Sequence, residues 1–446
     1  MLTSIVSAVV ILGLLIIVHE SGHFFVAKKL GVRVLRFSIG YPPRIAGIRR
    51  GETEYVIGAT PFGGYVRMLG EEIGDEPRSE ELNNFLVEIG HDITQIATAS
   101  DSRGAQAGKS EPDAALEQLA FHPDAVSFSR RLRPEETLLL NRIRISDSAA
   151  KARDSLQENP PDDLMAAFRA RAFPNQPLWK RFAIVLAGPA ANLLFAPILL
   201  ALLFMYGMPT PLPIVGELKA GMPAIQAGLK PGDKIVSVNG KLTPTWGEFS
   251  DVVRGSKGAP LSLDVDRPEG ATVIRIHVTV TPRREEQKTI YGTTTSEWII
   301  GVMPRGDAEI HRMNPISAGY HAVIGTASLT AQLVMGLAKI VTGGMPVREA
   351  LGGPIAIARM AGQEARQGLA SVAMFTVMLS LNLGLLNLLP VPLLDGGHLA
   401  FFVYEGVRGK PLAMRHREIA LQVGLFLLVA LMAFAIFNDI SRIVQG

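Results

Sequence analysis

The 446-residue chain contains no cysteine, which excludes disulfides, a thiolate nucleophile and a metal site with cysteine ligands. Its formal net charge is only +3, so the composition gives no sign of nucleic-acid binding. What the chain has instead is apolar sequence. Hydrophobic residues make up 48% of it, and the mean hydropathy of +0.25 is higher than soluble chains of this length usually show. The composition therefore favours a membrane protein in which any metal site uses His, Asp or Glu.

Four apolar runs are long enough to cross a bilayer, which takes ~20 helical residues. They lie within residues 1–30, 162–206, 369–398 and 419–446. The first run has no basic n-region and no convincing cleavage site, so we expect a retained helix rather than a signal peptide. Residues 318–341 are also apolar but carry scattered polar side chains. We interpret them as a surface helix within a linker of amphipathic helices at 286–368.

Lysine and arginine gather at one end of each predicted span, and their distribution sets the orientation. The three basic groups are Lys28, Lys29, Arg33 and Arg36; Lys180 and Arg181; and Arg408, Lys410, Arg415 and Arg417. All three fall on the cytoplasmic side if both termini lie outside. A fifth span would break this agreement, because it would reverse the helices on either side of the basic loop 399–418.

Three segments between the spans have different patterns. Residues 31–71 include a stretch that alternates apolar and polar side chains around Gly63 and Gly64, which predicts a pair of strands with a tight glycine turn. Residues 72–161 are rich in alanine, serine and charge with weak periodicity, so we expect a loosely ordered polar insertion on the cytoplasmic side. Residues 207–285 read as a small α+β domain on the outer side.

That outer segment contains the phrase Gly-Leu-Lys-Pro-Gly-Asp-Lys-Ile followed by Val-Asn-Gly. It resembles a PDZ domain of the bacterial, circularly permuted type. Such domains bind extended peptides by adding a strand in a groove. We expect the groove backbone at Val215, Gly216, Glu217 and Leu218.

The first apolar run contains His19-Glu20-Ser21-Gly22-His23, which fits the pattern His-Glu-x-x-His. Residues four apart share one face of a helix, so both imidazoles can reach one zinc ion, with Glu20 placed to deprotonate a zinc-bound water. Because each ionisable group in a membrane span costs about 2.5–3.5 kcal/mol on insertion scales, a purely structural role for this cluster is disfavoured.

A catalytic zinc site needs a third protein ligand. If the first and third spans both run from outside to inside, the inner end of the third lies at the depth of the histidines. Asp395 lies there with His398 as a rival ligand, and Glu405 is a more distant candidate.

The first-span motif together with Asn387-Leu-Leu-Pro390-Val-Pro392-Leu-Leu-Asp395-Gly396 resembles the site-2 protease family of intramembrane zinc metalloproteases. The single PDZ-like insertion narrows the resemblance to the bacterial regulator-of-sigma-E protease type. The phrases PFGGYVRMLGE, AGPAANLLFA and FNDISR also match. Better-known members carry two PDZ domains in tandem, and the insertion at 72–161 has no counterpart that we identify in them.

The resemblance implies an α-helical polytopic zinc endopeptidase with four transmembrane helices, a membrane-associated β-loop at residues 31–71 and one inserted α+β PDZ domain. It makes His19, His23 and Asp395 the Zn²⁺ ligands and Glu20 the general base. It also implies that the substrate is contacted by residues of the β-loop and of the third-span motif, namely Gly63, Gly64, Asn387, Pro390 and Pro392. Simpler interpretations are a plain hairpin turn at Gly63-Gly64 and an interhelical hydrogen bond from Asn387.

The family implies single-pass substrates such as anti-sigma factors and remnant signal peptides, in a bacterial inner membrane with the PDZ domain and both termini periplasmic. Two other classes of function are weaker. A membrane scaffold explains the PDZ domain but leaves His19, Glu20 and His23 without a role. A metal transporter would need polar residues at several depths, whereas the outer halves of these helices are almost wholly apolar.

Overall fold

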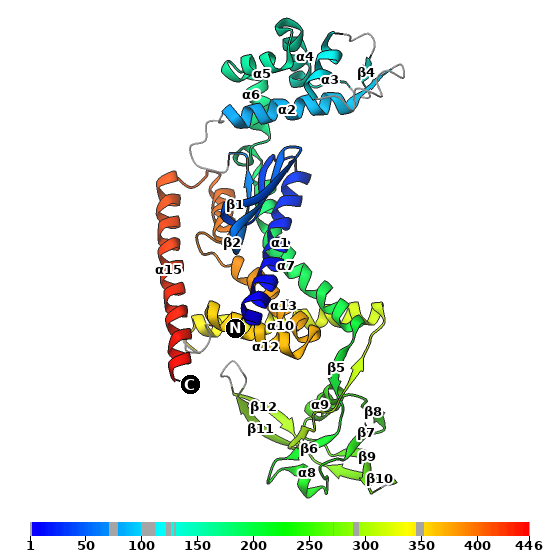
Figure 1. Cartoon of the computed structure of the whole chain (residues 1–446). Coiled ribbons are helices and arrows are strands. Elements are labelled where there is room, and N and C mark those ends of the chain that lie inside the picture. Colours follow the sequence, from blue (N-terminus) through cyan, green and yellow to red (C-terminus); the bar gives the residue numbers. More distant parts are fainter. Residues whose placement is uncertain are drawn as a thin grey trace. The chain divides into compact units, whose positions relative to one another are not determined.

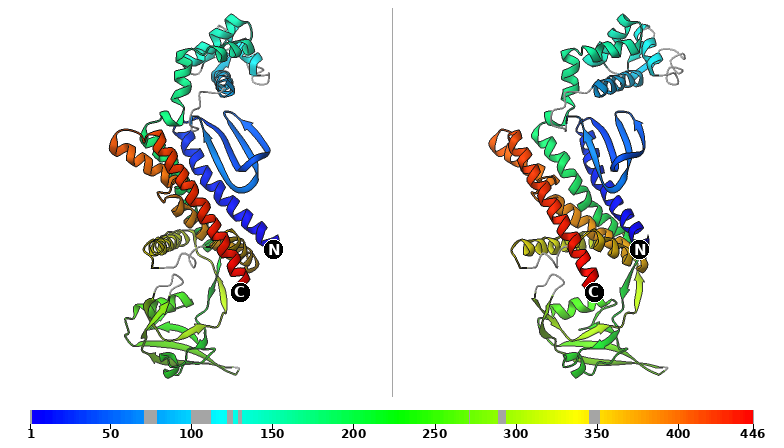
Figure 2. Two further views of the ribbon diagram at one scale, coloured as in Figure 1. Left: turned by 90° about the vertical axis from the view of Figure 1, so that its left-hand side faces the viewer. Right: turned by 60° about the vertical axis from the view of Figure 1, so that its left-hand side comes forward.

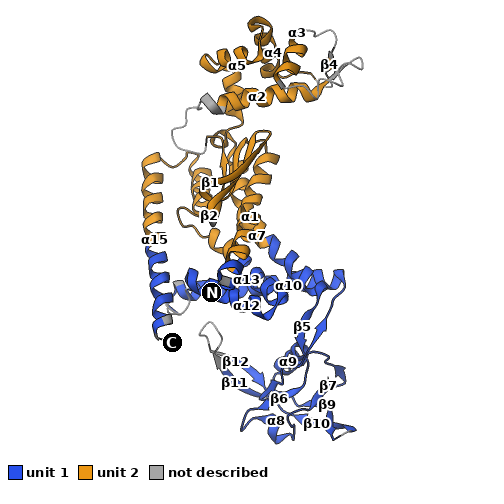
Figure 3. Cartoon of the chain, in the orientation of Figure 1, with its two compact units in different colours: residues 1–7, 194–382, 430–446 blue, residues 8–193, 383–429 orange. Residues whose placement is uncertain are grey.

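The computed structural model describes residues 2–70, 79–99, 112–121, 126–128, 131–270, 272–288, 294–344 and 352–445. They form two compact units (Figure 3). Unit 2 comprises residues 8–193 and 383–429, and unit 1 comprises residues 1–7, 194–382 and 430–446. Helices predominate, and the strands form small separate sheets (Figure 1).

Within the described residues, five helices are long and apolar enough to cross a membrane. They are α1 (Leu2–Lys29), α7 (Leu178–Tyr206), α10 (Pro315–Val341), α13 (Leu369–Asn387) and α15 (Met414–Gln445). This agrees with a polytopic membrane protein. The prediction of four spans treats α10 as a surface helix, and that assignment stays a prediction.

In unit 2, β1 (Val34–Arg50) and β2 (Thr53–Met68) form an antiparallel sheet beside α1 (Figure 2). Ser38 pairs with both Val56 and Tyr65, so the first part of β1 lies between two parts of β2. Apolar side chains of α1, β1, β2 and α7 pack together, among them Phe24, Phe37 and Ile184. The part of β2 at Gly64 and Tyr65 lies at the outer edge of this sheet.

The predicted loosely ordered insertion differs from what the structure shows. It contains the helices α2 (Ser79–Ile96), α3 (Pro112–Phe121), α4 (Pro134–Ser146) and α5 (Ala149–Glu158), with β3 (Ala97–Ala99) paired to β4 (Val126–Phe128), and α6 (Asp162–Ala170) follows directly after it. Leu82, Phe85, Leu86, Ile89 and Ile93 recur at helical spacing and are buried in a shared core. The polar average of the segment hid this pattern. Residues 71–78, 100–111, 122–125 and 129–130 of this region lie outside the described residues.

In unit 1, the α+β domain extends further along the chain than residue 285. It contains β5 (Met208–Pro211), β6 (Val215–Leu218), α8 (Pro223–Gln226), β7 (Lys234–Val238), β8 (Lys241–Leu242), α9 (Trp246–Gly255), β9 (Leu261–Glu269), β10 (Thr272–Val280), β11 (Arg283–Lys288), β12 (Thr294–Ile299), β13 (Val302–Pro304) and β14 (Ala308–His311). Strand β13 pairs with β6 and β14 pairs with β5. Part of the predicted linker at 286–368 therefore belongs to this domain, followed by α10 and α12 (Pro354–Gln367).

The third span ends earlier than predicted. Helix α13 stops at Asn387, and a new helix, α14 (Asp395–Arg408), begins after a short connection. Pro390 and Pro392 lie in this connection, and proline removes a backbone donor and disfavours helical geometry in the residue before it. Asp395 is thus the first residue of a second helix, and the basic loop predicted at 399–418 is largely helical.

Candidate metal centre

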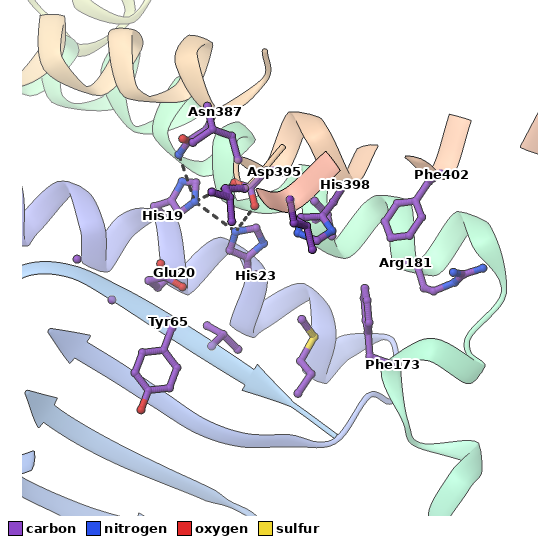
Figure 4. Close-up of a pocket in the computed structure, with 18 of the residues that line it drawn as sticks. His19, Glu20, His23, Tyr65, Phe173, Arg181, Asn387, Asp395, His398 and Phe402 are labelled. Atoms are coloured by element: carbon purple, nitrogen blue, oxygen red, sulfur yellow. Dashed lines mark hydrogen bonds and ion pairs between the residues drawn. The ribbon is translucent and has the colours of Figure 1, made fainter. Parts of the chain in front are cut away.

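Three side chains of unit 2 converge on one point (Figure 4). The Nε2 atoms of His19 and His23, one turn apart on α1, are 3.3 Å from each other. Asp395 places Oδ2 3.0 Å from His19 Nε2 and Oδ1 3.5 Å from His23 Nε2. Both histidines are buried. The structure therefore brings together the three residues that the motifs predicted as ligands.

The spacing of these atoms fits a zinc ion. Bonds of about 2.0–2.1 Å to nitrogen and oxygen in tetrahedral geometry put neighbouring ligand atoms about 3.3 Å apart. The histidine Nε2 atoms lie 3.3 Å apart, and each has an Asp395 oxygen close by, Oδ2 at 3.0 Å from His19 and Oδ1 at 3.5 Å from His23. Two imidazole nitrogens and one carboxylate also leave a fourth position for water or substrate, as catalytic zinc sites do.

Asp395 reaches this point because the start of α14 is tightly packed. A Cβ at Gly396 would lie 2.1 Å from the carbonyl oxygen of Leu389, and one at Gly397 would lie 2.5 Å from that of Val391. Only glycine allows the connection to fold back this closely on the helix that carries the carboxylate. The two glycines that follow Asp395 are therefore needed because a side chain at either position would collide with the backbone of the connection.

The two rival ligands are not among the three converging side chains. His398 lines the same cavity but does not belong to the group of converging ligand atoms. Glu405 forms an ion pair with Arg181, with Arg181 Nη1 3.2 Å from Glu405 Oε2.

Helix α7 holds the two histidines, and sequence reasoning missed this role. The carbonyl oxygen of Ile184 is 2.8 Å from His23 Nδ1, and the side-chain amide of Asn192 is 3.3 Å from His19 Nδ1. Between them, a Cβ at Gly188 would lie 2.1 Å from His23 Nε2. On the facing helix, a Cβ at Gly22 would lie 2.2 Å from the Ala187 carbonyl oxygen. The phrase AGPAAN was the available signal, since small residues at four-residue spacing let two helices approach closely.

The predicted substrate contacts are only partly brought to the site. A cavity of about 1080 Å³ is lined by His19, Glu20, Asn387, Gly63 and Gly64 and also by later residues of the β2 edge. A Cβ at Gly64 would lie 3.1 Å from Glu20 Cγ, so this strand runs directly beside the carboxylate (Figure 4). Asn387 Nδ2 is 3.5 Å from His19 Nε2.

The two prolines of the predicted substrate site are placed differently. Neither Pro390 nor Pro392 is among the residues that line the cavity, and Pro392 packs against Gly424 of α15. These prolines shape the connection that presents Asp395 and do not face the site.

In the outer domain, the strand predicted to line a peptide groove is not the strand whose edge lies next to the cavity. Val215 is buried and pairs with Pro304, and Gly216 packs against the Arg305 backbone. A separate cavity of about 540 Å³ lies between α9 and the β12–β13 segment, and Glu217 and Leu218 are the two predicted groove residues that line it. Since β6 already has β13 on one side and the backbone of residues 232–235 on the other, the edge next to the cavity belongs to β13.

Comparison with known proteins agrees with this geometry. The model of peptidase family M50 matches residues 7–431. The chain is 33% identical over 462 residues to "Protease RseP" of Yersinia pestis, covering 99% of both chains. It is 32% identical over 451 residues to "Zinc metalloprotease RasP" of Geobacillus kaustophilus, covering 99% of this chain and 98% of the relative. It is 29% identical over 453 residues to "Regulator of sigma-W protease RasP" of Bacillus subtilis, covering 99% of both. The chain therefore belongs to peptidase family M50, the site-2 protease family, as its motifs predicted.

Proposed function

We propose that this protein is a zinc endopeptidase that hydrolyses peptide bonds within or near transmembrane segments of other membrane proteins. The observation that carries the proposal is the convergence of three ligating side chains, two from the apolar helix α1 and one from the start of α14, with the Glu20 carboxylate beside them. His19, His23 and Asp395 would hold the ion. When bound, zinc polarises a carbonyl group and promotes ionisation of water near neutral pH.

The protein's own groups account for the remaining steps. Glu20 takes a proton from the attacking water and passes it to the leaving nitrogen. The outer edge of β2 lines the cavity at Gly64 and Tyr65 and would offer backbone partners to a substrate that has lost its helical hydrogen bonds, which must be replaced in a membrane. Asn387 lines the cavity next to His19 and would contact the substrate backbone.

The substrate class and orientation extend the same proposal. The name of one relative, a regulator of sigma-W protease, supports single-pass anti-sigma factors as substrates. We propose signal-peptide remnants as a second group. We place the protein in a bacterial inner membrane with four spans, the active site toward the cytoplasm and both termini outside. The outer domain would be a single PDZ domain that docks substrates or excludes those with large outer domains.

A Glu20→Gln variant tests the mechanism directly. It removes the proton acceptor but keeps the shape of the side chain, so cleavage of a transmembrane substrate in detergent should fall below detection while bound zinc stays at the wild-type level. Undiminished turnover would refute the proposed role of Glu20. The same variant, expressed in native membranes, should retain uncut substrates for identification by mass spectrometry.

A further inference from the structure

The two histidines are held from behind by one helix, at atoms that face away from the ligand cluster. Their Nε2 atoms face Asp395, whereas their Nδ1 atoms face α7. Ile184 and Asn192, which contact these Nδ1 atoms, lie eight residues apart on α7 with Gly188 midway between them. The same helix therefore orients both rings.

Metal binding through Nε2 determines whether the group next to each Nδ1 atom must accept or donate a hydrogen bond. A neutral imidazole that binds a metal through Nε2 carries its proton on Nδ1, and that proton needs an acceptor. The Ile184 carbonyl oxygen can only accept, so it suits His23. His19 needs an acceptor too, and an asparagine amide presents either its oxygen or its nitrogen after a rotation of the terminal group.

We propose that Asn192 is a positioning residue whose Oδ1 accepts the Nδ1 proton of His19 and thereby fixes the ring for metal binding through Nε2. Asn192 is fully buried, and its Nδ2 atom lies 3.3 Å from His19 Nδ1, so a half-turn of the amide group puts Oδ1 in that place. At such a depth no bulk water can replace the acceptor, and a buried donor without a partner costs about 1–3 kcal/mol. The inference rests on the proposed zinc centre and assigns a role to a residue outside the ligand set.

The test measures zinc affinity of the full-length protein in detergent by competition with a chromophoric chelator. Asn192→Leu removes the acceptor at similar volume and should weaken zinc binding about 10–100-fold. Asn192→Asp can only accept, so it should bind zinc within a few-fold of the wild type. Thr376→Val is the control, because it removes a buried hydroxyl that bonds within α13 and should leave zinc affinity unchanged.

The rescue by aspartate separates a hydrogen-bonding role from a packing role. If Asn192→Asp loses as much affinity as Asn192→Leu, or if Asn192→Leu binds zinc as tightly as the wild type, the inference is overturned. If Asn192→Leu cannot be purified, Asn192→Ala takes its place with the same expected loss. A wild-type protein that binds no zinc would instead refute the proposed metal centre itself, so the two failures are distinguishable.

Discussion

Two buried polar clusters in unit 2 differ in how their charges are balanced. The first is the metal-ligand cluster of His19, His23 and Asp395. With protons on their Nδ1 atoms, both imidazoles point a lone pair at the other and at a carboxylate, all within 3.5 Å. Electron-rich atoms at this spacing repel one another unless a cation or a proton lies among them. A bound zinc ion would supply that positive charge.

The second is the ionic cluster at the end of α1, made of Lys28, Arg33, Glu52, Glu88 and Arg171. The Glu52 carboxylate lies 2.6 Å from Lys28 Nζ and 2.6 Å from Arg171 Nη2. Glu88 accepts from Arg33 and, at 2.9 Å, from Arg171. Each carboxylate has two cationic partners within the chain, so this cluster needs no external ion. It joins α1, the β1–β2 turn and the helical insertion.

The comparison shows that buried charge alone does not identify a metal site. The metal-ligand cluster differs in that its ligand atoms face one another. The ion pairs that the structure describes for it include no lysine or arginine. Removing one member should therefore abolish function in the first cluster and should cost only stability in the second.

The largest effect is expected for Asp395→Ala. Two histidines remain as ligands, which is too few to retain zinc against dilution, so bound metal should fall to near zero and cleavage of a transmembrane substrate should become undetectable. Metal analysis of the purified protein measures the first and a gel assay the second. His398→Ala is the control and should keep its zinc. Loss of zinc in His398→Ala with retention in Asp395→Ala would contradict the assigned ligand set.

The sequence was sufficient to predict which three side chains come together at the proposed metal site, because the signals for them are local or strongly constrained. His19 and His23 follow helical spacing, and their presence in an apolar run demands a function. Asp395 followed from the expected depth of the third span and from the family motif, even though the structure starts a new helix there.

The parts that the sequence did not predict depend on contacts between distant segments. The Ile184 carbonyl that orients His23 is a backbone atom, so no residue type marks it. Strand β13 lies more than eighty residues beyond its partner β6, and pairing over such a separation leaves no periodic pattern. Asn192 could have been suspected, since a buried amide in a span requires partners. The insertion was misread because averaging over the segment concealed its apolar helical faces.

The next effect concerns the packing behind the histidines. Gly188→Ala places a methyl group only 2.1 Å from His23 Nε2. Because that is far closer than two such atoms can approach, the ring must move out of its ligand position. Zinc affinity should fall at least about 10-fold, as for loss of a residue that orients a ligand. Gly13→Ala is the matched control on α1, because nothing lies within 4 Å of its added Cβ. Equal zinc affinities of the two variants would show that α7 does not constrain His23.

A smaller effect is expected in the ionic cluster. Burial raises the pKa of Glu52, but Arg171 and Lys28 outweigh burial and the net pKa is lowered. A lowered pKa contributes stability that is present above the unfolded value of about 4.3 and is lost as pH falls through the folded value. Glu52→Gln should therefore cost about 2 kcal/mol of unfolding free energy at pH 7, less than a fully buried pair because Lys28 and Arg171 are partly exposed.

Denaturant unfolding in detergent at pH 7 and near pH 4 measures this difference. The penalty of Glu52→Gln should shrink at the lower pH, where Glu52 of the unfolded wild-type chain takes up a proton before the folded one does. Zinc content at pH 7 should be unchanged. A penalty that is the same at both pH values would show that the charge of Glu52 is not what stabilises the cluster.

The smallest effect is expected for an ion pair near the surface of the same insertion. Asp113 on α3 accepts two hydrogen bonds from Arg153 on α5, one of them from Nη2 at 2.7 Å, but 40% of the Asp113 side chain is exposed. Water and salt screen such a pair, so Asp113→Asn should cost no more than about 0.5 kcal/mol at pH 7, measured by the same unfolding assay. A loss as large as that of Glu52→Gln would mean that the geometry of the pair matters more than its burial. The contrast between the clusters would then rest on hydrogen-bond geometry instead of on the balance of buried charge.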